Sequence, residues 1–308
     1  MATFTADDDG LHRLSDRWWE TETAWFSFHV PERRLGGWLY TMVRQNIGTV
    51  AGGAWVWDDT AELPWDVLYS TNYTALQLAQ DADLRDIALP TGVSMKVVEP
   101  THAYDLGYHD PGRLELALRF TGVMPPEPLA AVGSTFGSAH HFDQFGRVTG
   151  AVVVNGEHID VDCIGMRDRT WGPRPEHRPR QAGYVTGAAD ADHGFLAVTN
   201  TGERDPIAYG FLRRDGRTVG LASGERVVER DQARGHATRV TITATDMDGR
   251  TLHAVGEPVS RMIINRHSFI DINSLVRWDL DGTTAWGEDQ DMWPVHTFAD
   301  ARRRGTFP

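Results

Sequence analysis

Four Asx–Gly dipeptides, each set between segments of alternating apolar and polar residues, constrain the fold of this chain most strongly. They are Asn155-Gly156, Asp215-Gly216, Asp248-Gly249 and Asp281-Gly282. Such dipeptides favour two-residue type I′ hairpin turns, because both turn positions need a positive φ. Before the last turn, Val276, Trp278 and Leu280 alternate with charged residues, which is typical of antiparallel sheet with one dry face. The second half is therefore predicted to be a meander of long hairpins, which tends to close on itself because closure removes edge strands.

The first half also consists mainly of strand-like segments. Short apolar or alternating runs occupy residues 26–30, 38–43, 52–57, 93–98 and 114–120. Helical periodicity is confined to residues 75–84 and 298–304. The Pro-rich, charged segment 173–180 cannot enter a sheet interior and is predicted to be an interdomain linker or a lid loop. The sequence therefore predicts an all-β protein, and its length suits one large domain or two of about 150 residues.

The composition excludes several classes of partner. The chain of 308 residues carries a net charge of −13, so phosphate repulsion makes nucleic acid and anionic membrane surfaces poor partners. A single cysteine, Cys163, rules out an internal disulfide framework and a cysteine-based zinc site, which fits a reducing cytoplasm. The N-terminus lacks the apolar stretch of a signal peptide, and no apolar run approaches the length of a membrane span. We expect a cytoplasmic protein.

The densest group of reactive side chains is the run Met166–Arg174, where a strand-like segment opens into a loop. Within it, Arg167, Asp168, Arg169 and Trp171 combine permanent cations, a carboxylate and a large aromatic face. Asp168 could act as acid or base, the arginines could clamp developing charge, and the indole could stack on a substrate. The alternative is a buried Arg–Asp pair that holds two sheets in register, with Trp171 as a core anchor.

Further side chains are candidates for chemistry in an apolar cavity. Because His140 and His141 are adjacent, a strand would point them to opposite faces, which argues against a metal site and leaves one of them facing inward. Glu288 would become a proton donor if an apolar barrel raised its pKa, and Tyr184 could add a phenol. The eleven tryptophans, Trp286 among them, suit either an all-β core or a pocket for a bulky apolar ligand. The plainer alternatives are a core histidine, a solvated acidic turn and a rim tyrosine.

Several segments together resemble the carotenoid 1,2-hydratase and AttH-like group. They are His141–Gln144, Gly146–Gly150, Gly165–Arg174 and Trp278–Glu288. The resemblance implies two lipocalin-like antiparallel β-barrels or strongly curved sheets in tandem, here residues 1–173 and 174–308, and reactions without cofactor on large apolar molecules. The group usually has His between the Asp and the Trp-Gly pair, where this chain has Arg169. Because a guanidinium cannot shuttle protons near neutral pH, Asp168, Glu288 or one of the two adjacent histidines would have to do so.

We predict a cofactor-independent hydratase or dehydratase, isomerase or cyclase, and so a lyase or isomerase, acting on a large apolar terpenoid- or steroid-like substrate. The predicted catalytic residues are Asp168, Arg169, Glu288 and His141. The predicted substrate-binding residues are Arg167, Trp171, Tyr184, His140 and Trp286. No metal ion or cofactor is expected. The alternatives are a non-catalytic binding protein for an apolar ligand and a structural sandwich whose charged motif only locks the fold.

Overall fold

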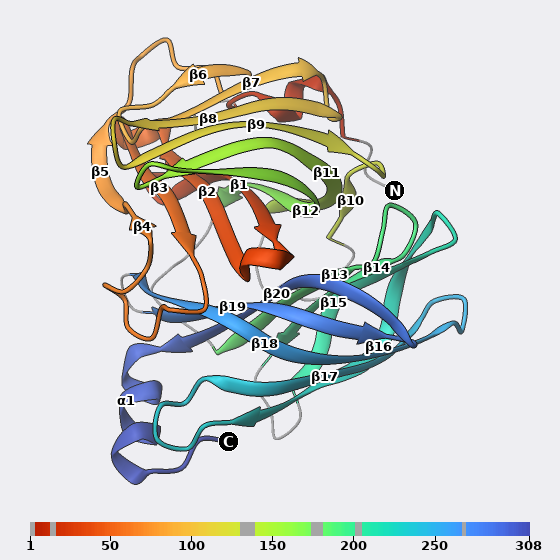
Figure 1. The fold of residues 1–308 in the computed structure, drawn as a ribbon. Coiled ribbons are helices and arrows are strands. Elements are labelled where there is room, and N and C mark those ends of the chain that lie inside the picture. Colours follow the sequence, from red (N-terminus) through yellow and green to blue (C-terminus); the bar gives the residue numbers. More distant parts are fainter. Residues whose placement is uncertain (1–3, 13–16, 130–138, 174–180, 201–204, 267–268) are drawn as a thin grey trace. The chain divides into compact units, whose positions relative to one another are not determined.

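The computed structural model describes residues 4–12, 17–129, 139–173, 181–200, 205–266 and 269–308. Strands hold 67% of the residues and helices 7%, which confirms the predicted all-β class. The chain forms two compact units (Figure 1). Of the described residues, unit 1 contains 4–58, 67–129 and 139–173, and unit 2 contains 59–66 and 181–308. The predicted linker or lid lies, beyond Pro173, outside the described residues. In the described ranges, no helix has the length and apolar character needed to cross a membrane.

Unit 1 is a curved antiparallel sheet with the strand order β4-β3-β2-β1-β12-β11-β9-β8-β7-β6, to which β5 adds beside β3 and β10 beside β11. Its strands are β1 (Glu20–Val30), β2 (Leu35–Arg44), β3 (Thr49–Trp57), β4 (Tyr69–Ser70), β5 (Tyr73–Gln77), β6 (Asp86–Ala88), β7 (Val93–Glu99), β8 (Ala103–Asp110), β9 (Leu114–Gly122), β10 (Glu127–Pro128), β11 (His140–Val154) and β12 (Glu157–Pro173). Three 3₁₀ turns are η1 (Ala6–Asp9), η2 (Pro31–Arg33) and η3 (Gln45–Ile47). The first and last strands, β1 and β12, lie side by side, so the central motif is in the middle of the sheet.

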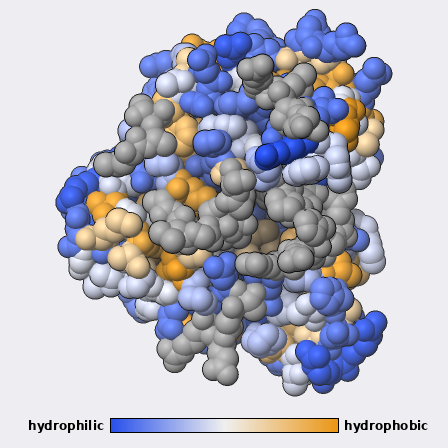
Figure 2. Space-filling model, turned by 180° about the vertical axis from the view of Figure 1, so that it is seen from behind, coloured by the Kyte–Doolittle hydropathy of each residue, from blue (hydrophilic) through white to orange (hydrophobic). Residues whose placement is uncertain are grey.

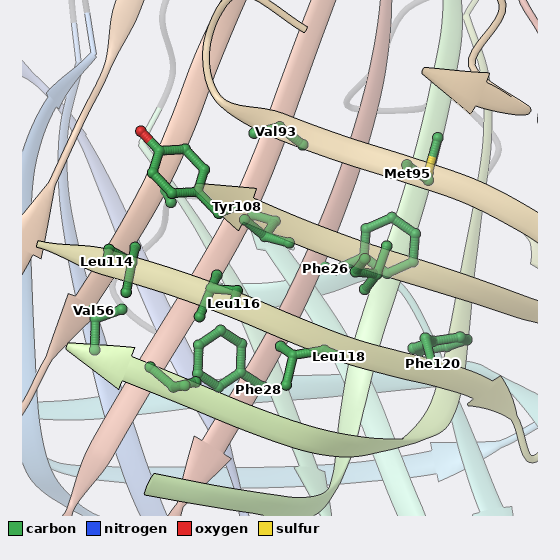
Figure 3. Packing of buried hydrophobic residues seen from close by; sticks show 14 of the residues in the cluster. Phe26, Phe28, Val56, Val93, Met95, Tyr108, Leu114, Leu116, Leu118 and Phe120 are labelled. Atoms are coloured by element: carbon green, nitrogen blue, oxygen red, sulfur yellow. The ribbon is translucent and has the colours of Figure 1, made fainter. Parts of the chain in front are cut away.

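One face of this sheet packs into an apolar core. Strand β9 shows the cause, because its buried apolar residues alternate with exposed Glu115 and Arg119. Figure 3 shows the apolar side chains of β9 beside those of β1 and β7, namely Leu114, Leu116, Leu118, Phe120, Phe26, Phe28, Val93 and Met95. Each fully buried side chain of this size contributes about 1.5–3 kcal/mol relative to exposure. The face in Figure 2 carries mainly hydrophilic residues, with hydrophobic ones in separate patches.

Unit 2 is a closed barrel of eight strands in sequential order, which confirms the predicted closed meander. Its strands are β13 (Ala182–Ala188), β14 (Gly194–Asn200), β15 (Asp205–Arg214), β16 (Arg217–Arg230), β17 (Ala237–Asp246), β18 (Thr251–Arg266), β19 (Phe269–Leu280) and β20 (Thr283–Pro294). Helix α1 (Val295–Arg304) follows and confirms the helix predicted at 298–304. The helix predicted at 75–84 is wrong, because β5 occupies its first turn.

The barrel interior combines an apolar core with a buried ionic group. Val276 and Trp278 belong to the core, and Arg226 lies on the inward face beside them. Arg226 donates two hydrogen bonds of 2.9 Å to Asp289 and one of 2.9 Å to Asp205. Burial opposes the charge of Arg226, but the carboxylates outweigh it and raise the pKa of the guanidinium. The charges are therefore paired rather than left alone in the core.

Three of the four predicted hairpin turns have type I′ geometry. The φ angles of Asn155, Asp215 and Asp281 are 50°, 52° and 49°, and the glycine after each is also positive. The prediction for Asp248-Gly249 is wrong, because four residues separate β17 from β18 there. A carboxylate oxygen of Asp246 accepts the backbone N–H groups of residues 248 and 250, and so holds the wider loop.

The buried histidine of β1 allows a test of how burial affects stability. His29 is buried, and burial lowers its pKa to about 4. The unfolded chain, with a pKa near 6.5, binds more protons between these values, so the free energy of unfolding falls as pH falls through this window. We predict that His29→Gln removes a loss on the order of 3 kcal/mol between pH 7 and pH 4, measured by urea unfolding. The exposed His158→Gln is the control, and an unchanged pH dependence in His29→Gln would contradict the prediction.

Candidate functional site

Strands β11 and β12 present two chemically different faces. Their register places Asp143 opposite Asp168 and Phe142 opposite Arg169. Directly opposed residues share a face, and neighbours along a strand point to opposite faces. We call the side with Asp143 and Asp168 the carboxylate face, and the side with Arg167, Arg169 and Trp171 the arginine face. The motif that was predicted to form one site is therefore divided between the two sides of the sheet.

On the carboxylate face, an imidazole has a polar neighbour at each nitrogen. His141 Nδ1 lies 2.7 Å from Oγ1 of Thr170, and Nε2 lies 3.1 Å from both carboxylate oxygens of Asp143. His141 is 2% exposed and Asp143 is 0% exposed. A ring nitrogen and a carboxylate oxygen at this distance share a proton, since both are otherwise acceptors. The pair therefore holds a proton in a dry environment, with the ring orientation fixed.

Three carboxylates stand in register on the same face. Glu127 of β10 is opposite Asp143, and Asp143 is opposite Asp168. Opposed side chains on neighbouring strands have Cβ atoms about 5 Å apart. Burial, with a smaller contribution from the charge of Asp143, raises the pKa of Glu127. Because closely spaced carboxylates resist ionising together, the row is arranged to keep a proton at a pH where isolated carboxyls have lost theirs.

A wall of tryptophans continues the carboxylate face across β1, β2 and β3. Trp25 is opposite Asp168, and its ring meets that of Trp38 edge-on at 5.5 Å between centroids. Trp38 in turn contacts Trp55 at 6.3 Å and Trp57 at 5.9 Å. All four indoles are buried. Aromatic faces stabilise a nearby cation, so the carboxylate row lies beside groups suited to positive charge.

The same side chains include the set of described residues that could hold a metal ion. One ligand atom each from His141, Asp143 and Asp168 lies within 4.8 Å of the others. An imidazole with two carboxylates suits several divalent cations. The cluster therefore has two chemical uses, proton transfer or cation binding, and chelation distinguishes them.

On the arginine face, Arg169 binds backbone and a carboxylate. It donates hydrogen bonds to the carbonyl oxygens of Gly10 at 2.5 Å and Thr23 at 3.1 Å, and to Glu22 at 2.7 Å. Burial alone would raise the pKa of Glu22, but the hydrogen bond from His12 and the charge of Arg169 lower it. Arg169 thus joins the N-terminal segment to the sheet.

Arg167 forms a second buried attachment to the same segment. It donates to Asp9 at 3.3 Å and lies over the ring of Tyr104, 4.0 Å from its centroid. Tyr104 also donates to Asp9, at 2.5 Å. The buried ion pairs of the motif are therefore made with Asp9 and Glu22, and the register turns Asp168 to the other side.

A cleft of about 250 Å³ opens on the arginine face. Trp171 lines it between two imidazoles, with His12 stacked at 4.3 Å and His140 at 5.3 Å between ring centroids. Glu20 and Glu22 supply carboxylates to its wall. The structure thus brings His140 and Trp171 together, across the sheet from Asp168.

The apolar interior of unit 1 leaves little room. The space between Phe26, Leu39, Met95 and Leu106 amounts to about 10 Å³, which holds one water at most. This pocket is too small for the apolar ligand expected from the family resemblance, because the core side chains fill the curve of the sheet.

In unit 2, Tyr184, Trp286 and Glu288 share the outer face of the barrel. Tyr184 is opposite Gln290, and residues 286, 288 and 290 alternate with inward-facing ones on β20. Val185, the neighbour of Tyr184, belongs to the interior core. Glu288 is buried but does not point into the barrel interior, the placement on which a raised pKa was expected.

Two members of the carboxylate row, Asp143 and Glu127, were not among the predicted site residues. The spacing of His141 and Asp143, two apart on a strand, is a signal that could have found Asp143. Glu127 lies in a proline-rich stretch, and only its long-range pairing with β11 brings it to the site.

The buried Arg169–Glu22 pair generates a stability prediction. Arg169→Gln leaves the Glu22 carboxylate buried without its cation, so we expect the free energy of unfolding to fall by about 3–5 kcal/mol. Arg147→Gln removes an exposed pair with Asp162 and is the control, with an expected change of less than about 1 kcal/mol. Chemical unfolding measures both, and equal effects would contradict the attachment role.

Solved structures share this fold at low sequence identity. An AttH-like protein from Nitrosomonas europaea has 14% identity and a TM-score of 0.56, covering 89% of this chain and 92% of its own. Kievitone hydratase from Nectria haematococca has 9% identity and a TM-score of 0.56, with 89% of each chain covered. CghA with Sch210972 has 12% identity and a TM-score of 0.54, covering 88% of this chain and 87% of its own. No curated protein sequence matches significantly. Residues 5–293 match the family described as Domain of unknown function (DUF7064), and the chain belongs to this family.

Proposed function

We propose that this protein is a cofactor-independent acid/base enzyme, a hydratase or dehydratase, isomerase or cyclase, whose active site is the carboxylate face of unit 1. The observation that carries the proposal is the buried cluster of His141, Asp143 and Asp168, with their ligand atoms within 4.8 Å. Proton transfer needs an acid and a base whose pKa values the environment sets apart, and a row of opposed carboxylates with a paired imidazole meets that need. The fold is shared with a hydratase, which supports this reaction class.

The acid in this scheme is Asp168. It is the member of the row opposite Trp25, so a proton that it delivers to an alkene or carbonyl creates positive charge beside an indole. Transfer of the proton forms a C–H or O–H bond and leaves the carboxylate as the conjugate base.

The base in this scheme is His141, held by Asp143 and Thr170. In a hydration, the water that attacks the cation gives one proton to the imidazole. In an isomerisation or cyclisation, the cation loses a neighbouring C–H proton to the same nitrogen. Shared protons along the row then restore the acid, with Glu127 as a reserve member.

The proposed substrate is a large apolar molecule of the terpenoid or steroid kind. Support comes from the four buried tryptophans on the carboxylate face, which offer an extended apolar surface with π faces. The scheme does not use Arg167 and Arg169, because the sheet separates them from Asp168. It does not use Glu288, which lies in unit 2.

Variants of the carboxylate row test the proposal. We predict that Asp168→Asn and His141→Gln each lower turnover by about 10²–10⁴-fold with an unchanged unfolding midpoint. Turnover is measured by mass spectrometry after incubation with lycopene, linalool or progesterone in ¹⁸O-labelled water and separately in D₂O. Hydration adds ¹⁸O, and isomerisation or cyclisation adds deuterium.

The matched control is Asp162→Asn, an exposed carboxylate on the same strand that pairs with Arg147. It should leave turnover unchanged. Full activity in Asp168→Asn would remove Asp168 from the chemistry. Ligands that quench tryptophan fluorescence yet are recovered with unchanged mass would make the protein a carrier.

Chelation tests the cofactor independence of the cluster. Because the proposed chemistry uses only protons held by side chains, turnover should persist after treatment with EDTA and dialysis. Loss of turnover that Mg²⁺, Mn²⁺ or Zn²⁺ restores, together with loss of metal binding in Asp143→Asn, would instead make the cluster a metal centre.

A further inference from the structure

The outer face of the unit 2 barrel carries a side chain that the protein leaves without a hydrogen-bond partner. Asn273 on β19 is 0% exposed, and among the described residues neither its amide nitrogen nor its amide oxygen is bonded. Burying such a group unbonded costs about 1–3 kcal/mol. A leucine of similar size would avoid that cost. A buried, unbonded asparagine therefore indicates a partner from outside the chain.

Asn273 belongs to a row of side chains that crosses four strands. The register places it opposite Met262 of β18 and Gln290 of β20, and it places Gln290 opposite Tyr184 of β13. Ser260, two residues before Met262 on the same face, has a buried hydroxyl that is also unbonded within the described chain. Several polar groups thus converge on one part of the face.

Apolar side chains border this row on the same face. Met262 is 1% exposed and Leu275, two residues from Asn273, is 0% exposed. Beyond Tyr184, the register adds Val198 of β14 and Tyr209 of β15. A few fixed polar groups within a larger apolar area are the usual make-up of a site for a small organic molecule.

We propose that this face binds an organic molecule with an apolar skeleton and one oxygen function, a carbonyl or hydroxyl group, which accepts a hydrogen bond from Nδ2 of Asn273. A hydroxyl group also donates to the amide oxygen. A hydrocarbon of the same shape leaves the amide unbonded and binds less tightly, because a site built for a hydrogen bond rejects the analogue that lacks it. The proposal concerns binding in unit 2 and goes beyond the acid/base chemistry proposed for unit 1.

Camphor and camphane test this, since they share one bicyclic skeleton and differ by a ketone oxygen. Binding of each to the full chain is measured by calorimetric titration. The wild-type protein should bind camphor about 10-fold more tightly than camphane, as expected for one hydrogen bond to a buried group. Asn273→Leu should abolish that preference by weakening camphor alone. The control, Asn265→Leu on the exposed side of β18, should keep it.

The unliganded variant gives a second readout. Asn273→Leu should melt at or above the wild-type temperature, because it removes an unbonded amide from a buried position. Equal wild-type affinities for the two probes would overturn the proposal, and so would failure of camphor to bind. A fall of several degrees in the melting temperature of unliganded Asn273→Leu would overturn it as well, since the amide would then have a structural partner such as ordered water.

Discussion

The antiparallel register of β11 and β12 is the constraint on which the rest of unit 1 depends. Because the side-chain period of a strand is two, this register decides which residues of the central motif act together. It places Asp143 opposite Asp168 and leaves the arginines on the other side. A shift by one residue would exchange the two faces and place guanidinium groups beside the tryptophans. Chemistry on one side and attachment of the N-terminal segment on the other both follow from this pairing.

The two faces manage buried charge in different ways. On the arginine face every carboxylate meets a cation or a donor, as Glu22 does with Arg169, so the charges are stable and chemically quiet. On the carboxylate face, Glu127 and Asp143 are opposed to each other, and protons must compensate the charge. Only the second arrangement favours proton transfer. The sequence places both kinds of group within one nine-residue run, and only the pairing of strands separates them.

The sequence predicted local features well and long-range ones in part. The turns at Asn155, Asp215 and Asp281 follow from local backbone preferences, and three such hairpins suffice to predict a closed meander. The turn at Asp248 failed because Asp246 binds backbone N–H groups and widens the loop. His141 and Asp168 could be singled out by residue type. Glu127 could not, because its place on the sheet depends on a two-residue bridge to a strand that begins after a gap in the chain.

The central claim is that the carboxylate face holds a proton on a carboxyl group at neutral pH. Difference infrared spectroscopy on ¹³C-carboxyl-labelled protein measures this directly, because a protonated carboxyl has a C=O band that shifts in D₂O. The wild-type protein at pH 7 should show this band, and Glu127→Gln or Asp168→Asn should remove or displace it, while Asp162→Asn leaves it unchanged. A wild-type spectrum with ionised carboxylates alone at pH 7 would contradict the account.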